Sequence, residues 1–181
     1  LADEVHRYGA KLSIELTHAG AVVAGDWARD LDQSVRDPDL LKGQFLAPSV
    51  ITGIHDPRTT KEINRAEMDE VKQHWVDCVR RLKMAGFDMA MIHGGHMNLL
   101  ASFLTPLLNR RKDDYGGSPE NRMRFPLELL KACRDEVGRD FGLEIRLSGD
   151  ERVKGGVTLQ ERIQFLNAAA PYIDLVNIST G

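Results

Sequence analysis

Short apolar segments alternate along this chain with longer segments whose apolar residues recur at helical spacing, and this order limits the fold class. The spacing predicts strands at 11–16, 87–92, 143–147 and 175–178, and helices at 1–8, 65–85, 119–137 and 158–170. No Gly-x-Gly-x-x-Gly motif follows any of these strands, which disfavours a doubly wound dinucleotide-binding fold. Repeated strand-then-helix units with long loops after the strands favour an α/β fold, part of a TIM (β/α)₈ barrel.

The length of the chain fits only part of such a barrel. A complete (β/α)₈ barrel needs roughly 250 residues, and this chain has 181 residues with about four β/α units. Leu1 falls inside a helical segment, and the segment 177–181 reads as a strand running into a loop. We therefore expect residues 1–181 to be a single fragment of one barrel domain, cut from a larger fold.

Local signals set the limits of the predicted helices. Asn64 with Glu67, and Thr158 with Glu161, have the spacing of capping boxes. Ser118 followed by Pro119 is a cap residue followed by proline at the first helical position. The stretch 19–60 is rich in Gly, Pro and Asp and predicts a long loop, and a second loop is predicted between 93 and 118.

Composition excludes several classes of partner. The formal net charge is −3, with 42% hydrophobic and 28% charged residues and no basic stripe, which argues against nucleic acid. No apolar run has membrane-spanning length and no signal-peptide pattern is visible, so we expect no membrane partner and a cytoplasmic location. Cys78 and Cys133 are far apart inside helical patterns, which predicts free thiols acting as small core residues in a reducing compartment.

Polar residues follow the end of every predicted strand. Glu15 to His18 end the first, His93 to His96 follow the second, Arg146 to Glu151 end the third, and Asn177 to Gly181 end the fourth. Chemistry in a (β/α)₈ barrel sits at the carboxyl ends of the strands. The pattern therefore predicts a ring of functional groups around a pocket that takes a small-molecule substrate.

His93 and His96 form the most specific pair. Two imidazoles three residues apart, separated by glycines, can converge on one oxygen atom and stabilise charge that develops on it. They could also be structural histidines. A metal site would need a third ligand, and no carboxylate or cysteine stands at a familiar spacing; we therefore predict no metal.

Arg146 lies between Ile145 and Leu147 on a predicted strand and is expected to point into the barrel. A buried arginine needs an anionic partner. That partner could be a carboxylate such as Glu15, or an electron-rich atom of a cofactor such as the pyrimidine end of a flavin.

The chain resembles the old yellow enzyme family of NADH:flavin oxidoreductases, ene-reductases and 2,4-dienoyl-CoA reductases. The segments that carry the resemblance are Ile92–His96 (IHGGH), Leu99–Leu107 (LLASFLTPL), Asn109–Ser118 (NRRKDDYGGS), Glu120–Phe125 (ENRMRF), Glu15–Gly20 (ELTHAG), Ala47–Ser49 (APS) and Arg146–Ser148 (RLS). They cover essentially the whole chain and correspond to the third through sixth strands of the family's barrel.

The resemblance implies an FMN cofactor and a reaction in two halves. NADH or NADPH reduces the flavin, which then passes a hydride to the β-carbon of an α,β-unsaturated carbonyl compound. It implies that His93 and His96 hold the carbonyl oxygen, that Arg146 contacts the N1/O2 edge of the flavin, and that the residue at position 15 contacts its pyrimidine face.

Two positions depart from the family pattern. Glutamine is usual at position 15, whereas an ionised Glu15 can only accept hydrogen bonds, so it would suit the flavin N3–H, oppose O2, or pair with Arg146. Many members have a tyrosine at position 98 that protonates the α-carbon, and Asn98 cannot act as a general acid near neutral pH. Water or another residue then supplies the proton, or the reaction needs no such acid, as in a dehydrogenation.

Two other functions stay open. One is a metal-assisted lyase or hydrolase on the same barrel, because fold does not fix chemistry. The other is a catalytically inactive half-barrel, since in the resembling family the last two strands supply the loops that bind the FMN phosphate. An open barrel edge would expose unpaired strand groups, which predicts self-association into a homo-oligomer.

Overall fold

The computed structural model describes residues 1–22, 45–51 and 60–180. Four strands, β1 (Ser13–Leu16), β4 (Met89–Gly94), β5 (Gly142–Ser148) and β6 (Leu175–Ser179), form one sheet in the order β1-β4-β5-β6. Every neighbouring pair is parallel. The predicted α/β class and the four parallel strands are confirmed.

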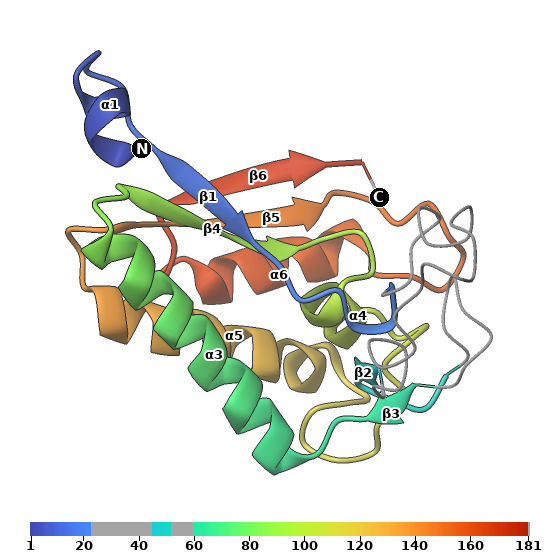
Figure 1. Cartoon of the computed structure of the whole chain (residues 1–181). Helices are drawn as coiled ribbons and strands as arrows, with labels where there is room; N and C mark the ends of the chain where they lie inside the picture. Colours follow the sequence, from blue (N-terminus) through green and yellow to red (C-terminus); the bar gives the residue numbers. More distant parts are fainter. Residues whose placement is uncertain (23–44, 52–59, 181) are drawn as a thin grey trace, which may run out of the picture.

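Helices cover one face of this sheet. In Figure 1, α3 (Arg65–Met84), α5 (Pro119–Val137) and α6 (Leu159–Ala169) lie below it, and the short α1 (Ala2–His6) precedes β1. Parallel strands joined by helices on one face are the repeating unit of a barrel wall. The opposite face of the sheet is therefore the side that a closed barrel turns inward.

The three long helices begin where their capping residues predict. The Asn64 side chain accepts from Glu67 N, the Thr158 side chain accepts from Glu161 N, and both capping boxes are complete. The Ser118 side chain accepts from Asn121 N, and Pro119 occupies the first turn of α5. A cap satisfies backbone N–H groups that have no partner inside the helix, so these short motifs fix each start locally.

The apolar core lies between the helices and the outward-facing residues of the strands. Buried side chains from α3 and α5 meet Ala90 and Ile92 of β4 and Leu143, Ile145 and Leu147 of β5. On α3, Met68, Val71, Trp75 and Val79 form a buried stripe at helical spacing, whereas Leu82 and Cys78, which was predicted to be a core residue, are only half-buried. Cys78 lines a hollow with Leu16 and His18 beside the outer edge of β1, which explains its partial exposure.

Four details of the predicted elements are wrong. The loop expected between 93 and 118 contains a helix, α4 (Leu99–Leu104), and β4 continues through His93 and Gly94. The loop expected at 19–60 contains a 3-10 turn, η1 (Gly20–Val22), and strand β2 (Leu46–Ala47), which pairs with β3 (Lys61–Glu62). Its segments 23–44 and 52–59 lie outside the described residues. The first helix is also shorter than predicted.

Both outer strands of the sheet leave apolar side chains exposed. Ile14 on β1 is 41% exposed, and Val176 and Ile178 on β6 are 37% and 59% exposed. Among the described residues β1 and β6 each pair on one side only. No helix in the described part of the chain is long and apolar enough to cross a membrane.

Candidate active site at the strand ends

The predicted site residues lie on the face of the sheet opposite the helices. Successive side chains of a strand alternate between faces, and Ile92, Ile145 and Leu147 point into the helix-side core. His93 and Arg146 therefore point to the other face, where they are direct partners in the β4–β5 register. Glu15 is the partner of Met91, which places it on the same face as His93, one diagonal step away.

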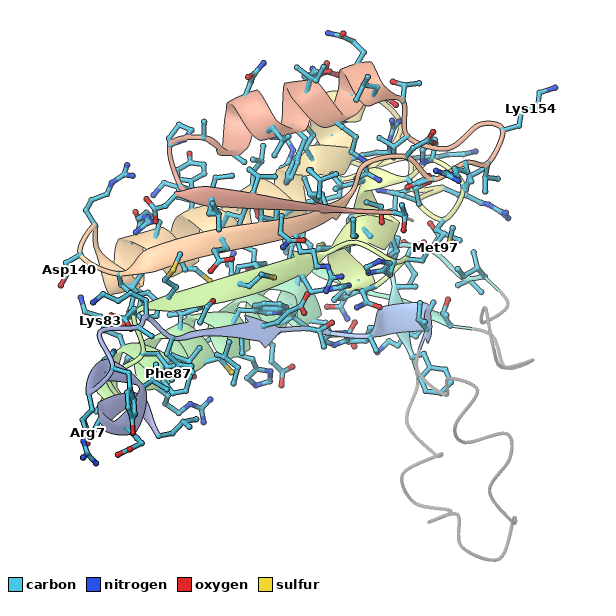
Figure 2. All side chains as sticks on the ribbon, turned by 90° about the horizontal axis from the view of Figure 1, so that it is seen from above. Arg7, Lys83, Phe87, Met97, Asp140 and Lys154 are labelled. Carbon is cyan, nitrogen blue, oxygen red and sulfur yellow. The ribbon has the colours of Figure 1, made fainter. Side chains whose placement is uncertain are left out.

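The loop after β4 brings His96 back over His93. His96 and Met97 have positive φ angles of 51° and 57°, which turn the chain sharply at this end of the sheet. Figure 2 shows Met97 at one end of the sheet and Lys83, Phe87 and Asp140 at the other. His96 N donates to Ser148 Oγ at 3.0 Å, so the turn is fastened to the end of β5.

The two imidazoles contact each other directly. His96 Nδ1 lies 3.1 Å from His93 Nε2, and the ring centroids are 5.1 Å apart with an interplanar angle of 27°. His93 is buried at 8% exposure. The two imidazoles are therefore brought together as a hydrogen-bonded stack at the carboxyl end of β4, while their convergence on one ligand oxygen stays a prediction.

Glu15 joins this pair to Arg146. Its Oε1 atom accepts a hydrogen bond from His93 Nδ1, and its Oε2 atom lies 3.2 Å from Arg146 Nη1. Partial burial opposes ionisation of Glu15, but the hydrogen bond from His93 and the charge of Arg146 outweigh it, so its pKa lies below the usual range. The carboxylate that was expected as a partner of Arg146 is thus present and ionised.

Arg146 has one buried donor that is unpaired among the described residues. Its Nε atom is buried and has no hydrogen-bond partner among the described residues. A buried N–H without an acceptor is costly, and native structures almost always satisfy it. The free donor lies on the inward face, so it fits an acceptor atom of a molecule bound there.

Asn98 lies apart from the four clustered residues. Its Nδ2 atom donates to Thr17 Oγ1 at 2.7 Å, tying the start of α4 to the end of β1. The Asn98 side chain makes no capping hydrogen bond to α4. It therefore braces the loop that carries His96.

Two residues at the end of β6 contact His96, although neither was predicted to have a specific role. Ser179 Oγ lies 3.2 Å from His96 Nε2, and the Thr180 carbonyl oxygen lies 3.2 Å from the same atom. Both belong to a strand end that sequence reasoning had marked as polar. Their contact with His96 depends on the positive-φ turn after β4, which the sequence pattern did not indicate.

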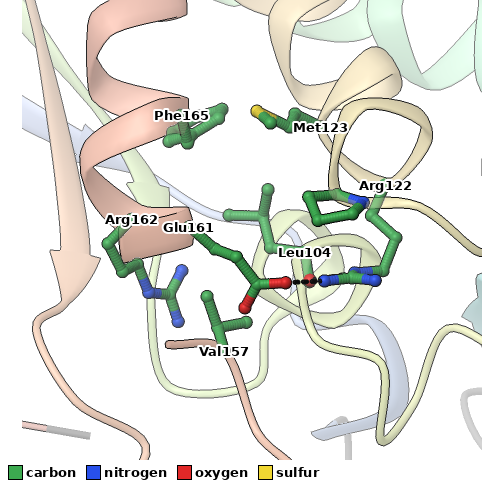
Figure 3. Close-up of a pocket in the computed structure, with 8 residues that line it drawn as sticks. Leu104, Arg122, Met123, Val157, Glu161, Arg162 and Phe165 are labelled. Atoms are coloured by element: carbon green, nitrogen blue, oxygen red, sulfur yellow. Dashed lines mark hydrogen bonds and ion pairs between the residues drawn. The ribbon is translucent and has the colours of Figure 1, made fainter. Parts of the chain in front are cut away.

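A separate small cavity lies on the helix side of the sheet. Figure 3 shows Leu104 of α4, Met123 of α5 and Phe165 of α6 around it, together with the Arg122–Glu161 ion pair. Its volume of about 10 Å³ suits about one water molecule. None of the predicted site residues lines it.

Comparison with known proteins matches residues 1–180 to the NADH:flavin oxidoreductase / NADH oxidase family. The chain is 37% identical over 182 residues to an NADPH dehydrogenase of Geobacillus sp. WCH70, covering 100% of this chain and 48% of that protein. The chain thus spans about half the length of this relative.

Solved structures agree on the architecture. Histamine dehydrogenase from Rhizobium sp. 4-9 is 27% identical, with a TM-score of 0.84 over 99% of this chain and 25% of its own. Old Yellow Enzyme from Pichia sp. AKU4542 is 28% identical, with a TM-score of 0.76 over 98% of this chain and 49% of its own. The fold is therefore part of a TIM barrel of the old yellow enzyme type, whose cofactors are FMN and NADH or NADPH. The chain belongs to the NADH:flavin oxidoreductase / NADH oxidase family.

Proposed function

We propose that this chain forms the substrate-binding half of an FMN-dependent oxidoreductase that uses NADH or NADPH to reduce the activated C=C bond of an α,β-unsaturated carbonyl compound. The observation that carries the proposal is the cluster of His93, His96, Glu15 and Arg146 on the inward face at the strand ends. The family match and the similarity to an NADPH dehydrogenase support it.

The residues present fit a flavin. Arg146 offers the buried Nε donor that has no partner among the described residues, and its charge would stabilise an anionic reduced ring at the N1/O2 edge. Glu15 would accept from the flavin N3–H, and its charge is offset by Arg146. Bound FMN supplies hydride transfer between the nicotinamide and the β-carbon of the substrate.

His93 and His96 are proposed to hold the carbonyl oxygen of the substrate. Donors directed at an oxygen that gains negative charge stabilise the transition state of hydride addition more than the ground state. Asn98 contributes to substrate binding by bracing the His96 loop through Thr17. The proton for the α-carbon must come from water or another residue, because an amide is no general acid near neutral pH.

The proposal extends to the setting of the reaction. Residues 1–181 form one fragment of an FMN-binding barrel domain, and the free thiols of Cys78 and Cys133 fit a reducing cytoplasm. The open sheet edges would favour association with the rest of a barrel or with another copy. We expect residues 1–181 alone to bind FMN weakly or not at all.

The test is the visible absorption spectrum of the purified full-length protein, before and after anaerobic addition of NADH or NADPH. A flavin spectrum that bleaches with either nucleotide and recovers on addition of 2-cyclohexenone is the expected result. A colourless protein that takes up no added FMN would overturn the proposal. Bleaching without recovery would support reduction of the flavin by the nucleotide and would contradict an α,β-unsaturated carbonyl compound as the substrate.

The histidine roles are tested separately with His93→Ala and His96→Ala. Each variant should keep the flavin spectrum and its bleaching by nucleotide, while reoxidation by 2-cyclohexenone slows, because the donors to the carbonyl oxygen are lost. Unchanged reoxidation in both variants would remove the histidines from the site.

A further inference from the structure

Glu15 determines where one proton of the histidine pair must lie. An ionised carboxylate can only accept hydrogen bonds, and Glu15 accepts from His93 Nδ1 while it is also paired with Arg146. The Nδ1 atom of His93 must therefore carry the hydrogen. In a neutral His93, the other nitrogen, Nε2, is then without one.

The second proton of the neutral pair is also committed. His93 Nε2 lies 3.1 Å from His96 Nδ1, so a bare Nε2 requires His96 Nδ1 to be the donor. His96 Nε2 is then bare as well, and it can accept the one hydroxyl hydrogen of Ser179 at 3.2 Å, for which the Leu147 carbonyl oxygen at 3.4 Å is the longer alternative. The carbonyl oxygen of Thr180, also 3.2 Å from Nε2, is a pure acceptor and has no hydrogen to accept in this state.

Counting hydrogens gives a limit on what the pair can bind. Two neutral imidazoles carry two N–H groups, and Glu15 takes one of them, which leaves one for a ligand. A ligand oxygen held by a donor from each ring needs a third N–H. We propose that binding of a ligand oxygen by both His93 and His96 is coupled to the uptake of one proton. The histidine pair is then a cation when it holds its ligand.

This inference rests on the proposed function and narrows it to a ligand class. A cationic pair favours an oxygen that is anionic, or that becomes anionic as hydride reaches the β-carbon, over a neutral oxygen. A glutamine at position 15 would remove the constraint, because its amide can donate to His93 Nδ1 as well as accept. Both neutral rings would then have an N–H for the ligand.

The charged groups around the pair allow it to hold an added proton. On β1 the facing charge is Glu15, and on β5 it is Arg146, with Glu144 on the same face two residues earlier and buried at 4% exposure. From β6 the uncharged Asn177 and Ser179 share this face. The charges of Glu15 and Arg146 offset each other, so a proton added to the pair meets no net opposing charge from these two.

The experiment measures protons taken up when the oxidised, FMN-bound full-length protein binds 2-cyclohexenone. Isothermal titration calorimetry in phosphate and in Tris at about pH 8, above the usual range of an imidazole, gives the number of protons from the difference in apparent enthalpy. The wild type should take up about one proton per ligand bound, and Glu15→Gln about none. Ser179→Ala is the matched control, which leaves Glu15 in place and should still take up about one.

Each outcome separates this inference from the proposed function. Binding without proton uptake in the wild type would overturn the inference and leave the proposed function standing. Equal uptake in the wild type and Glu15→Gln would also overturn it, because the proton would then not depend on Glu15. A protein that binds neither FMN nor 2-cyclohexenone would overturn both.

A second measurement reads the resting state directly. Side-chain ¹⁵N NMR of the ligand-free protein should show His93 protonated at Nδ1 and bare at Nε2 in the wild type. A His93 protonated only at Nε2 would contradict the hydrogen bond to Glu15, whatever the ligand does.

Discussion

Arg146 on β5 and Glu15 on β1 form an ion pair across the intervening strand β4, with Arg146 Nη1 3.2 Å from Glu15 Oε2. The pair leaves Arg146 Nε buried and without a partner among the described residues. Arg146 is therefore held in place by Glu15, which preorganises its side chain for the flavin contact that we propose. Such preorganisation lowers the cost of ordering a side chain on binding.

Replacement of Arg146 tests this arrangement. Arg146→Met in the full-length protein should weaken FMN binding by about tenfold to a hundredfold, the equivalent of one charge-assisted hydrogen bond. Quenching of flavin fluorescence during titration measures the dissociation constant. Glu15→Gln serves as the comparison, since it removes the carboxylate but keeps the arginine, and it should weaken FMN binding less. An unchanged dissociation constant in Arg146→Met would exclude Arg146 as a flavin contact.

The sequence predicted the long helices well because their start signals are local. Asn64 and Thr158 cap their helices through residues three positions away, so no knowledge of the rest of the fold is needed. Helix α4 was missed for the opposite reason. All six of its residues, Leu99–Leu104, are buried, so the segment has no polar face to reveal helical spacing, and Asn98 makes no cap.

The sequence predicted the four residues of the cluster, His93, His96, Glu15 and Arg146, but only some of the contacts between them. The Glu15–Arg146 pair was foreseen as one of two alternatives, because a buried arginine needs an anion. The contact between Glu15 and His93 was not, since it depends on the register that sets Glu15 opposite Met91, one diagonal step from His93. Register between strands whose paired residues are 76 positions apart, as Glu15 and Met91 are, follows from the packing of the whole sheet and has no local signature.

Asp88 should make the stability of the fold depend on pH in the acid range. Its carboxylate accepts from His6 Nε2 at 2.7 Å, Lys11 Nζ at 2.8 Å and Leu12 N at 2.9 Å. The hydrogen bonds from Lys11, His6 and Leu12 hold its pKa far below the usual range. A carboxyl whose pKa is lower in the folded state stabilises above its unfolded pKa of about 4 and loses that contribution as pH falls through the folded value.

Asp88→Asn should therefore lower the free energy of unfolding near neutral pH and reduce its fall toward acid. Urea unfolding at a series of pH values from about 7 down to about 2 measures the difference. The curves of the two proteins should converge at the acid end. A constant difference across this range would show that Asp88 acts through packing and not through its charge.

Gly116 and Gly117 are adjacent but should respond differently to alanine. A β-carbon at Gly116 would collide with the backbone carbonyl of Arg111, whereas at Gly117 nothing lies within 4 Å and the cost is that of a φ of +80°. Gly117→Ala should cost about 1 kcal/mol, and Gly116→Ala about 3 kcal/mol because the backbone must shift. Thermal unfolding of both variants checks the order. Equal losses would mean that the loop relaxes around the new methyl group.

The buried pair of Arg162 and Glu151 should be costly to break. Arg162 Nη2 lies 3.0 Å from Glu151 Oε1, and the side chains are 5% and 7% exposed. Arg162→Met would leave a buried carboxylate with only Thr105 Oγ1 and Val157 N as donors, and should lower stability by about 3–5 kcal/mol. Removing both charges in Arg162→Met/Glu151→Gln should restore part of the loss, as measured by urea unfolding. A double variant as unstable as the single one would show that the guanidinium matters for packing alone.

The two cysteines should differ in reactivity because only one of them is enclosed. Cys133 on α5 is 0% exposed, and burial raises its pKa to about 12, so it has almost no thiolate at neutral pH. Cys78 on α3 is half-buried and borders the hollow beside β1. Alkylation of the native full-length protein with iodoacetamide should label Cys78 and leave Cys133 unmodified until urea unfolds the chain. Mass spectrometry of the peptides separates the two sites, and labelling of native Cys133 at the rate seen in urea would contradict its enclosure between α5 and the sheet.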